Sequence, residues 1–197
     1  LTSYHDYIER QKAPQLIGEL KQGKSIALIS DAGTPCIADP GYHLVRAAIE
    51  ADIRVEAVPG PSAVAAALSI AGLPTDRFAF EGFVPARQSA RRKFFEALAH
   101  EPRTLLMYEA ARRLASCLRD LHEVMGDRRV VIVRELTKMF EEVMRGPIGE
   151  ISQRLSNQPP PQGEVTLLIA GATTAASPPA PSEDLAAAIE RLRSEGM

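Results

Sequence analysis

Three short loops combine acidic, hydroxyl-bearing and glycine residues in places where a ligand could bind. Each comes after an apolar run typical of a buried strand. Residues 30–35 read Ser-Asp-Ala-Gly-Thr-Pro, residues 59–63 read Pro-Gly-Pro-Ser-Ala, and residues 134–138 read Arg-Glu-Leu-Thr-Lys. Open α/β sheets bind their ligands at the carboxyl ends of the strands, where such loops lie. The three loops are therefore the first candidates for a binding or catalytic site.

The first two loops suit a small polar ligand. Asp31 can accept hydrogen bonds from an amine or hydroxyl, and Gly33 permits close approach of a backbone. Ser62 stands at the expected N-cap of an alanine-rich helix, whose free N–H groups suit a carboxylate or an adenosine edge. A structural interpretation stays open for each loop: an Asx turn at Asp31, simple capping by Ser62, and a solvated loop at 134–138.

Basic residues gather near the starts of two predicted helices. The formal net charge of the chain is −2, so a nucleic-acid partner would need a local basic patch. The candidates for such an RNA-binding patch are Arg87, Arg91, Arg92, Lys93, Arg112 and Arg113. A solvated helix face is the alternative interpretation of the same charges.

The composition indicates an ordinary globular protein. Of the 197 residues, 45% are hydrophobic and 24% charged, a balance that argues against disorder over most of the chain. There is no apolar run near the roughly 18 residues of a membrane span and no leader-like start, so we expect a cytoplasmic protein. Cys36 and Cys117 are far apart in the sequence, without a metal-ligand spacing. We expect both to be reduced packing residues and expect no metal site.

The hydrophobic pattern predicts alternating strands and helices, as in an α/β protein. The first part is predicted to hold two short helical pieces within 4–22 that meet at Pro14, then strands at 25–30 and 53–58 and helices at 42–51 and 63–71. After a junction at 72–76 we expect strands at 78–83, 104–108, 129–134 and 164–170, an extended piece at 141–145, and helices at 89–100, 112–125 and 147–155. The predicted units are 1–74, 75–171, and 172–197, an Ala/Pro-rich linker with the start of a helix at 183–195.

Four further motifs accompany the three loops in a fixed order. They are Asp-Pro-Gly-Tyr at 39–42, Gly-Leu-Pro-Thr-Asp-Arg-Phe at 72–78, Glu-Gly-Phe-Val-Pro at 81–85 and Gly-Glu-Val-Thr-Leu at 163–167. With these motifs the chain resembles, over residues 1–171, the bacterial 16S rRNA (cytidine-2′-O)-methyltransferase family of the tetrapyrrole-methylase superfamily. The resemblance implies the two-domain fold of class III methyltransferases, with a mainly parallel N-terminal sheet and a mixed C-terminal sheet. It also implies S-adenosyl-L-methionine as cofactor, 16S rRNA within the small ribosomal subunit as substrate, and a homodimer.

The resemblance also assigns roles to particular residues. The cofactor would lie in a cleft between the domains, in contact with residues from both parts of the chain. The implied contacts are Asp31, Ala32, Gly33, Thr34, Ile37, Ser62, Ala63, Tyr108 and Leu136. In the family, a first strand and a proline-rich glycine loop precede the part matched here, so we expect an upstream segment. Arg112 stands where the family usually has His, whereas Arg113 matches.

Methyl transfer to a ribose hydroxyl needs alignment more than strong acid or base groups, because a sulfonium methyl is already activated. Some group must nevertheless receive the proton of the 2′-hydroxyl. Glu81, Glu135 and Lys138 are the candidates, and Lys138 can act as a base only if burial lowers its pKa. Two other functions stay open: a tetrapyrrole or diphthamide-precursor methyltransferase, and a non-catalytic S-adenosylmethionine-binding protein.

Overall fold

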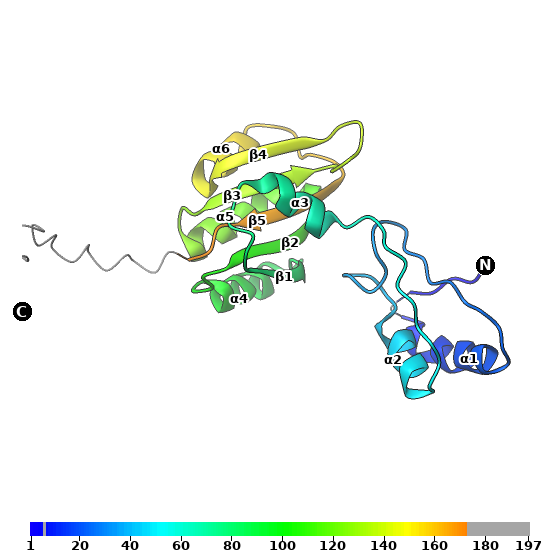
Figure 1. Cartoon of the computed structure of the whole chain (residues 1–197). Coiled ribbons are helices and arrows are strands. Elements are labelled where there is room, and N and C mark those ends of the chain that lie inside the picture. Colours follow the sequence, from blue (N-terminus) through cyan, green and yellow to red (C-terminus); the bar gives the residue numbers. More distant parts are fainter. Residues whose placement is uncertain (6, 173–197) are drawn as a thin grey trace, which may run out of the picture.

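Two helices packed against one another form the N-terminal part of the computed structural model, which describes residues 1–5 and 7–172 (Figure 1). Helix α1 (Glu9–Lys21) packs through Ala13 and Leu16 against Leu44 of α2 (Tyr42–Glu50). The prediction of two helical pieces meeting at Pro14 is wrong, because α1 continues through the proline. Proline removes one N–H donor from the helix, and the burial of Ala13 and Leu16 on either side offsets that loss.

The two strands expected in this part do not form. Residues 25–30 and 53–58 run without strand pairing, and no strand precedes Phe78 in the described chain. A strand exists only when a neighbour takes up its backbone N–H and C=O groups, and neither segment has such a partner among the described residues. Their apolar side chains are accordingly open, with Ile29 at 74% and Val58 at 86% exposure. The parallel N-terminal sheet is therefore not found in this part of the structure.

The later part of the chain builds a five-stranded mixed sheet, as predicted. Its spatial order is β1-β2-β5-β3-β4, in which β1 pairs with β2 in parallel and the other neighbours are antiparallel. Fully buried leucine, isoleucine and valine side chains of the three inner strands explain the near-continuous apolar runs of the sequence. The strands are β1 (Phe78–Phe83), β2 (Thr104–Ala110), β3 (Arg129–Arg134), β4 (Glu142–Pro147) and β5 (Glu164–Ile169).

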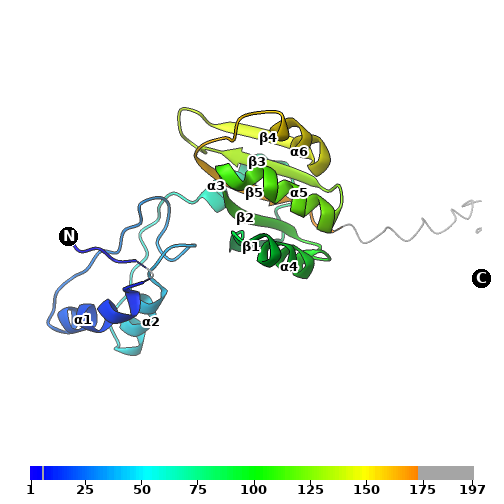
Figure 2. The same ribbon diagram turned by 180° about the vertical axis from the view of Figure 1, so that it is seen from behind.

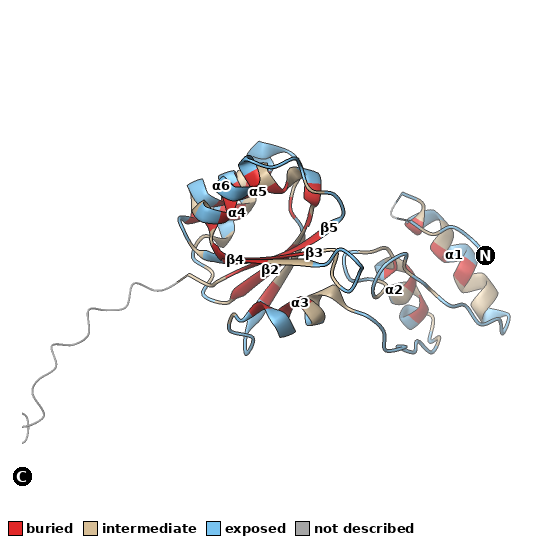
Figure 3. Cartoon of the chain, turned by 90° about the horizontal axis from the view of Figure 1, so that it is seen from above, coloured by how far each residue is buried: buried red, intermediate tan, exposed pale blue. Residues whose placement is uncertain are grey.

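Helices cover both faces of this sheet. Helices α4 (Gln88–Leu98), α5 (Leu114–Met125) and α6 (Ile148–Ser156) lie on one face, and α3 (Ala63–Ala71) lies on the other (Figures 2 and 3). The larger core contains buried side chains of the three-helix face, among them Phe95, Leu118 and Ile148. A 3-10 turn at Ala111–Arg113 precedes α5.

Helix α3 (Ala63–Ala71) covers the opposite face, where Ala67 and Leu68 pack against Leu106 and Leu168. The Arg145 guanidinium of β4 donates hydrogen bonds to carbonyls at the carboxyl end of α3, with a 2.5 Å contact to the Ile70 carbonyl. The packing thus groups α3 with the sheet, whereas the predicted boundary near residue 74 separates them. The helix predicted at 183–195 lies outside the described residues.

Candidate functional site

The carboxyl ends of β1, β2 and β3 lie at one edge of the sheet. Phe83 ends β1 in register with Tyr108 of β2, and Thr166, near the start of β5, pairs with both Tyr108 and Val133. Because β5 runs antiparallel to β2 and β3, its first residue, Glu164, lies at the same edge. Figure 1 shows the N-terminal helices and their long loops on this side of the sheet. The motifs at 81–85, 134–138 and 163–167, far apart in sequence, therefore meet in space.

A hydrogen bond joins the two N-terminal loops singled out in the sequence. The Thr34 hydroxyl donates to the Pro61 carbonyl over 2.9 Å. The Ser30 hydroxyl contacts the Asp39 carboxylate and accepts from the Ala32 N–H at 3.2 Å, which shapes the backbone before Gly33. The predicted contacts Asp31, Ala32, Gly33 and Ile37 are all exposed. The first loop is therefore held by hydrogen bonds at Ser30 and Thr34, while the residues between them are exposed.

The start of α3 connects these loops to the sheet. Ser62 caps the helix, and its hydroxyl accepts the Ala65 N–H at 3.4 Å. One residue after the predicted contact Ala63, the Val64 side chain packs in the same cluster as Leu136 and Tyr108. Cofactor contacts predicted from three separate stretches of sequence are thus brought close together by α3.

Tyr108 lies among aromatic side chains at the sheet edge. Its ring packs edge-to-face with Phe80 and Phe83, at centroid distances of 5.0 and 5.3 Å. Burial raises the pKa of the Tyr108 hydroxyl, and the negative charges of Asp39 and Glu164 raise it further. The charge of Asp39 acts on Tyr108, so the loop after residue 30 comes within electrostatic reach of the tyrosine.

Glu9 is a buried polar residue that the sequence analysis missed. Its carboxylate accepts the N–H groups of Gly41 at 3.0 Å and His43 at 2.8 Å, and so fixes the Asp-Pro-Gly-Tyr turn from α1. Gly41 has a φ of 142°, and a Cβ there would lie 2.6 Å from the Cys36 Sγ. Cys36 is free, as expected, but largely exposed, whereas Cys117 is free and buried. The sequence marks the Asp-Pro-Gly-Tyr turn, but nothing in it indicates that Glu9 binds this turn.

The loop after β3 is held by a network of ion pairs. The Lys138 ammonium lies 3.0 Å from carboxylate oxygens of both Glu135 and Glu164. Glu135 also accepts the Glu164 N–H at 3.0 Å, and a Cβ on Gly163 would overlap the Glu135 carboxylate. Any other residue at 163 would also be strained, since the φ there is +98°.

These contacts determine the charges of the two residues in the network. Hydrogen bonds from the Glu164 N–H and from Lys138 lower the pKa of Glu135. Hydrogen bonds to Glu164 and Glu135 raise the pKa of Lys138, the opposite of what a lysine base requires. Lys138 could act as a base only if burial lowered its pKa, and that condition is not met in this structure, because its ammonium is half-exposed and paired with two carboxylates.

Comparison with known proteins identifies the family of this arrangement. The family of Tetrapyrrole (Corrin/Porphyrin) Methylases matches residues 5–152, which include both N-terminal loops and the loop after β3. The chain belongs to the tetrapyrrole methylase family. Solved structures agree on the fold: the methyltransferase CobJ has a TM-score of 0.60 at 17% identity, covering 83% of this chain and 72% of its own. A diphthine synthase has a TM-score of 0.59 at 17% identity, covering 85% and 68%.

Curated relatives are much closer in sequence, and share one name, Ribosomal RNA small subunit methyltransferase I. The protein of Xylella fastidiosa (strain Temecula1) is 50% identical over 87% of this chain and 64% of its own length. That of Escherichia coli O157:H7 is 49% identical over 87% and 60%. The Mycobacterium tuberculosis protein is 42% identical over the whole chain and 67% of its own length. The chain spans 60–64% of the length of the first two relatives.

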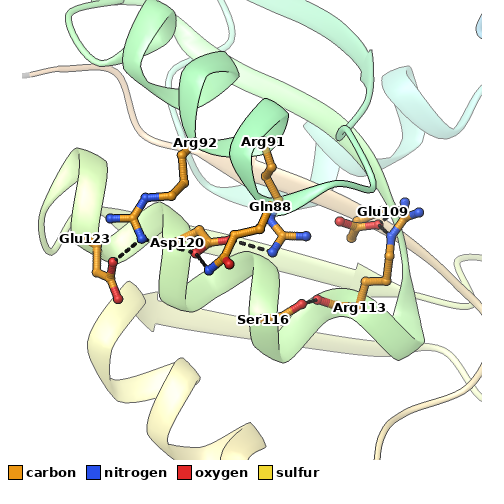
Figure 4. A network of polar contacts seen from close by, with 8 residues as sticks. All are labelled: Gln88, Arg91, Arg92, Glu109, Arg113, Ser116, Asp120 and Glu123. Atoms are coloured by element: carbon orange, nitrogen blue, oxygen red, sulfur yellow. Dashed lines mark hydrogen bonds and ion pairs between the residues drawn. The ribbon is translucent and has the colours of Figure 1, made fainter.

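The predicted RNA-binding cations of this tetrapyrrole methylase fall into two groups, and half of them are already paired (Figure 4). Arg91 is only 4% exposed and binds the buried Asp120 carboxylate through two nitrogens. The assignment of Arg91 to an RNA surface is therefore wrong, because its guanidinium cannot reach solvent. Arg92 pairs with Glu123 at 2.6 Å, and Arg113 with the buried Glu109 at 2.5 Å.

The other half of the basic cluster is free. Arg87, Lys93 and Arg112 are exposed and form no ion pair within the described residues. Arg87 immediately precedes α4, and Arg112 lies in the 3-10 turn after β2, so both are at the edge where β1 and β2 end. Glu81 is partly buried in the bulged part of β1, without a hydrogen-bond or ion-pair partner among the described side chains.

A hollow of about 460 Å³ lies elsewhere, between α1 and α2. Its lining includes Ala13, Ile17, His43 and Glu50, and none of the predicted cofactor contacts. Its polar lining comes from exposed helix positions, so it does not define the site. In the described part of the chain, no helix is both long and apolar enough to span a membrane, and no three His, Cys, Asp or Glu side chains cluster as metal ligands.

Proposed function

We propose that the protein transfers a methyl group from S-adenosyl-L-methionine to the ribose 2′-oxygen of a cytidine in 16S rRNA of the small ribosomal subunit. The relatives named for ribosomal RNA methylation, 42–50% identical, support the substrate. The structural support is the hydrogen bond between Thr34 and Pro61, because it joins the two ligand-type loops on the side of Tyr108 and Leu136. A substrate in the small ribosomal subunit would also place the protein in the cytoplasm.

The residues at the sheet edge fit the proposed cofactor. Asp31 to Thr34, with Ile37, offer exposed backbone and a carboxylate for its amino-acid and ribose parts. Ser62 and Ala63 lie at the start of α3, where the first turn of the helix has free backbone N–H groups. The Ser62 cap takes up only the N–H of Ala65. The Tyr108 ring supplies a half-buried aromatic surface for the adenine, and Leu136 closes the site from the loop after β3.

S-adenosylmethionine supplies a methyl group already activated by its positively charged sulfur. Transfer would break the carbon–sulfur bond as the bond to the ribose oxygen forms, and a base or water would have to accept the hydroxyl proton. Glu135 is engaged by Lys138 and by backbone, whereas the Glu81 carboxylate has no partner among the described residues. Glu81 is thus the best candidate for the proton acceptor. The main task of the protein is to align the two reactants.

The RNA surface in this proposal consists of Arg87, Lys93 and Arg112. Each exposed cation can neutralise one phosphate, which is how a chain of net charge −2 would hold RNA. We also propose a homodimer, since one small chain offers little surface for a folded RNA. Folded RNA is recognised largely by shape, so a partly assembled small subunit should be a better substrate than a short oligonucleotide.

The decisive experiment measures methyl transfer by the full-length protein from labelled S-adenosylmethionine to small-subunit particles, with a tetrapyrrole and a diphthamide precursor as competing substrates. We expect label in RNA, and a single cytidine linkage that resists alkaline cleavage because its 2′-oxygen is blocked. Calorimetry with S-adenosylhomocysteine should give one site per chain. Label on a base, a tetrapyrrole or a protein refutes the proposed function, and binding without transfer to any of them leaves only a cofactor-binding protein.

A further inference from the structure

Phe83 is an exposed aromatic residue in an unusual position. It ends β1, yet 59% of its surface is exposed. The β1–β2 register shifts between Phe80 and Phe83, and Gly82 within the bulge has a φ of 68°. Bulges redirect side chains and are common beside active sites. The bulge here directs a large apolar ring out of the sheet at the edge where the site lies.

The exposed ring is held in place rather than free to move. It packs edge-to-face on Tyr108, with centroids 5.3 Å apart and planes inclined at 61°. Tyr108 in turn packs against Phe80 and against the buried cluster on the α3 face. A ring supported at its edge, with most of its surface open, offers an apolar plane against which another flat group can stack.

Positive charge accompanies this ring. The Arg113 guanidinium is 3.5 Å from the carbonyl of Val84, the residue after Phe83, which links the 3-10 turn after β2 to the end of β1. Arg112 in that turn and Arg87 before α4 are exposed and without ion pairs in the described chain. An exposed aromatic plane at the same end of the strands as these free cations matches a nucleotide, whose base stacks while its phosphates bind the cations.

We propose that Phe83 is the stacking platform for an unpaired nucleobase of the RNA substrate, beside the bound methyl donor. This inference rests on the proposed function and adds to it the residue that recognises the splayed nucleotide. Stacking the base fixes the attached ribose near Tyr108 and the N-terminal loops. Such an arrangement is what transfer to one ribose among many requires.

The test compares Phe83→Ala with Phe83→Tyr and Phe83→Leu in the full-length protein. Phe78→Ala is the matched control, since Phe78 is 40% exposed at the other end of the same strand. Affinity for small-subunit RNA and for S-adenosylhomocysteine is measured for each variant. Loss of a stacked base weakens RNA binding by about 5- to 140-fold, from a stacking contribution of roughly 1–3 kcal/mol. The Tyr variant should bind RNA as the wild type does, and the Leu variant only weakly.

The outcomes separate the platform from its alternatives. The inference is wrong if Phe83→Ala binds RNA as tightly as Phe78→Ala, or if Phe83→Leu retains full RNA affinity. It is also wrong if Phe83→Ala loses affinity for S-adenosylhomocysteine, because Phe83 would then belong to the cofactor site, or if the variant changes the oligomeric state, because the ring would then be a subunit contact. Failure of the wild-type protein to methylate RNA would instead refute the proposed function itself.

Discussion

Replacing Arg91 by alanine should destabilise the protein without affecting a phosphate contact. The guanidinium is 5% and the Asp120 carboxylate 3% exposed, and Arg91 Nε lies 2.7 Å from Asp120 Oδ2 (Figure 4). Removing one member of a buried ion pair costs about 3–5 kcal/mol, because the other charge is left unpaired in the interior. Gln88 at 3.0 Å and Arg92 at 3.7 Å still stabilise the Asp120 carboxylate in the variant. We therefore expect the free energy of unfolding to fall by an amount near the lower limit, about 3 kcal/mol.

Urea denaturation of Arg91→Ala and of Arg92→Ala provides the measurement and its control. Arg92 is 40% exposed and its main partner Glu123 is 55% exposed, so its loss should cost under about 1 kcal/mol. The larger loss corresponds to a fall in melting temperature of roughly 6–12 °C for a chain of this size. Equal effects of the two substitutions would refute the reasoning. So would a flatter salt dependence of RNA binding in Arg91→Ala at temperatures where the variant is folded.

The same ion pair predicts a pH dependence. Burial raises the pKa of Asp120, but hydrogen bonds from Gln88 and Arg91 outweigh it, so the net pKa is lowered. A lowered carboxyl pKa stabilises the fold above the unfolded value of about 3.9, and this stabilisation is lost as pH falls through the folded pKa. In Arg91→Ala, protonation instead removes an unpaired buried charge. The difference in free energy of unfolding between variant and wild type should therefore narrow as the pH falls, first through the raised pKa of Asp120 in the variant and then through its lowered pKa in the wild type. A difference that stays constant with pH would contradict the assignment.

Three further predictions follow from other contacts. Replacing Arg87 and Arg112 together by alanine should reduce the slope of log affinity for RNA against log salt by roughly 1.4–1.8, with stability unchanged, as titrations at several salt concentrations would detect. Thr34→Val should weaken S-adenosylhomocysteine binding several-fold in calorimetry, because the 2.9 Å bond between the loops is lost. Gly163→Ala should cost at least about 1 kcal/mol in urea denaturation, because a left-handed residue there is strained and its Cβ would displace Glu135.

The sequence predicted the C-terminal sheet well because its elements carry their own signals. The strands at 129–134 and 78–83 have the predicted bounds, since apolar runs between turn residues mark the inner strands. The α3 helix at 63–71 likewise begins and ends where Ser62 and Gly72 indicate. These signals are local in the sequence, and the strands and helices that pack against each element lie in the same part of the chain.

The strands predicted at 25–30 and 53–58 failed for a reason that periodicity cannot reveal. An apolar run measures how readily a segment can be buried, whereas a strand also needs a second backbone in register. The loops after both segments nevertheless meet through Thr34 and Pro61. The motifs therefore indicated two loops that lie together, even though the strands expected to support them do not form, and their role as a cofactor site stays a prediction.

The basic cluster shows how sequence reasoning could have distinguished buried from exposed charges. Arg91 precedes Phe95 by four residues, so both lie on one face of α4, and Phe95 is fully buried. Asp120 likewise follows the buried Cys117 by three residues on α5. A charged residue on the apolar face of one helix predicts an opposite charge on the apolar face of a neighbouring helix, since an unpaired buried ion would destabilise the fold. Arg87 precedes the helix and so does not lie on its apolar face, and it is one of the exposed cations whose loss should weaken RNA binding.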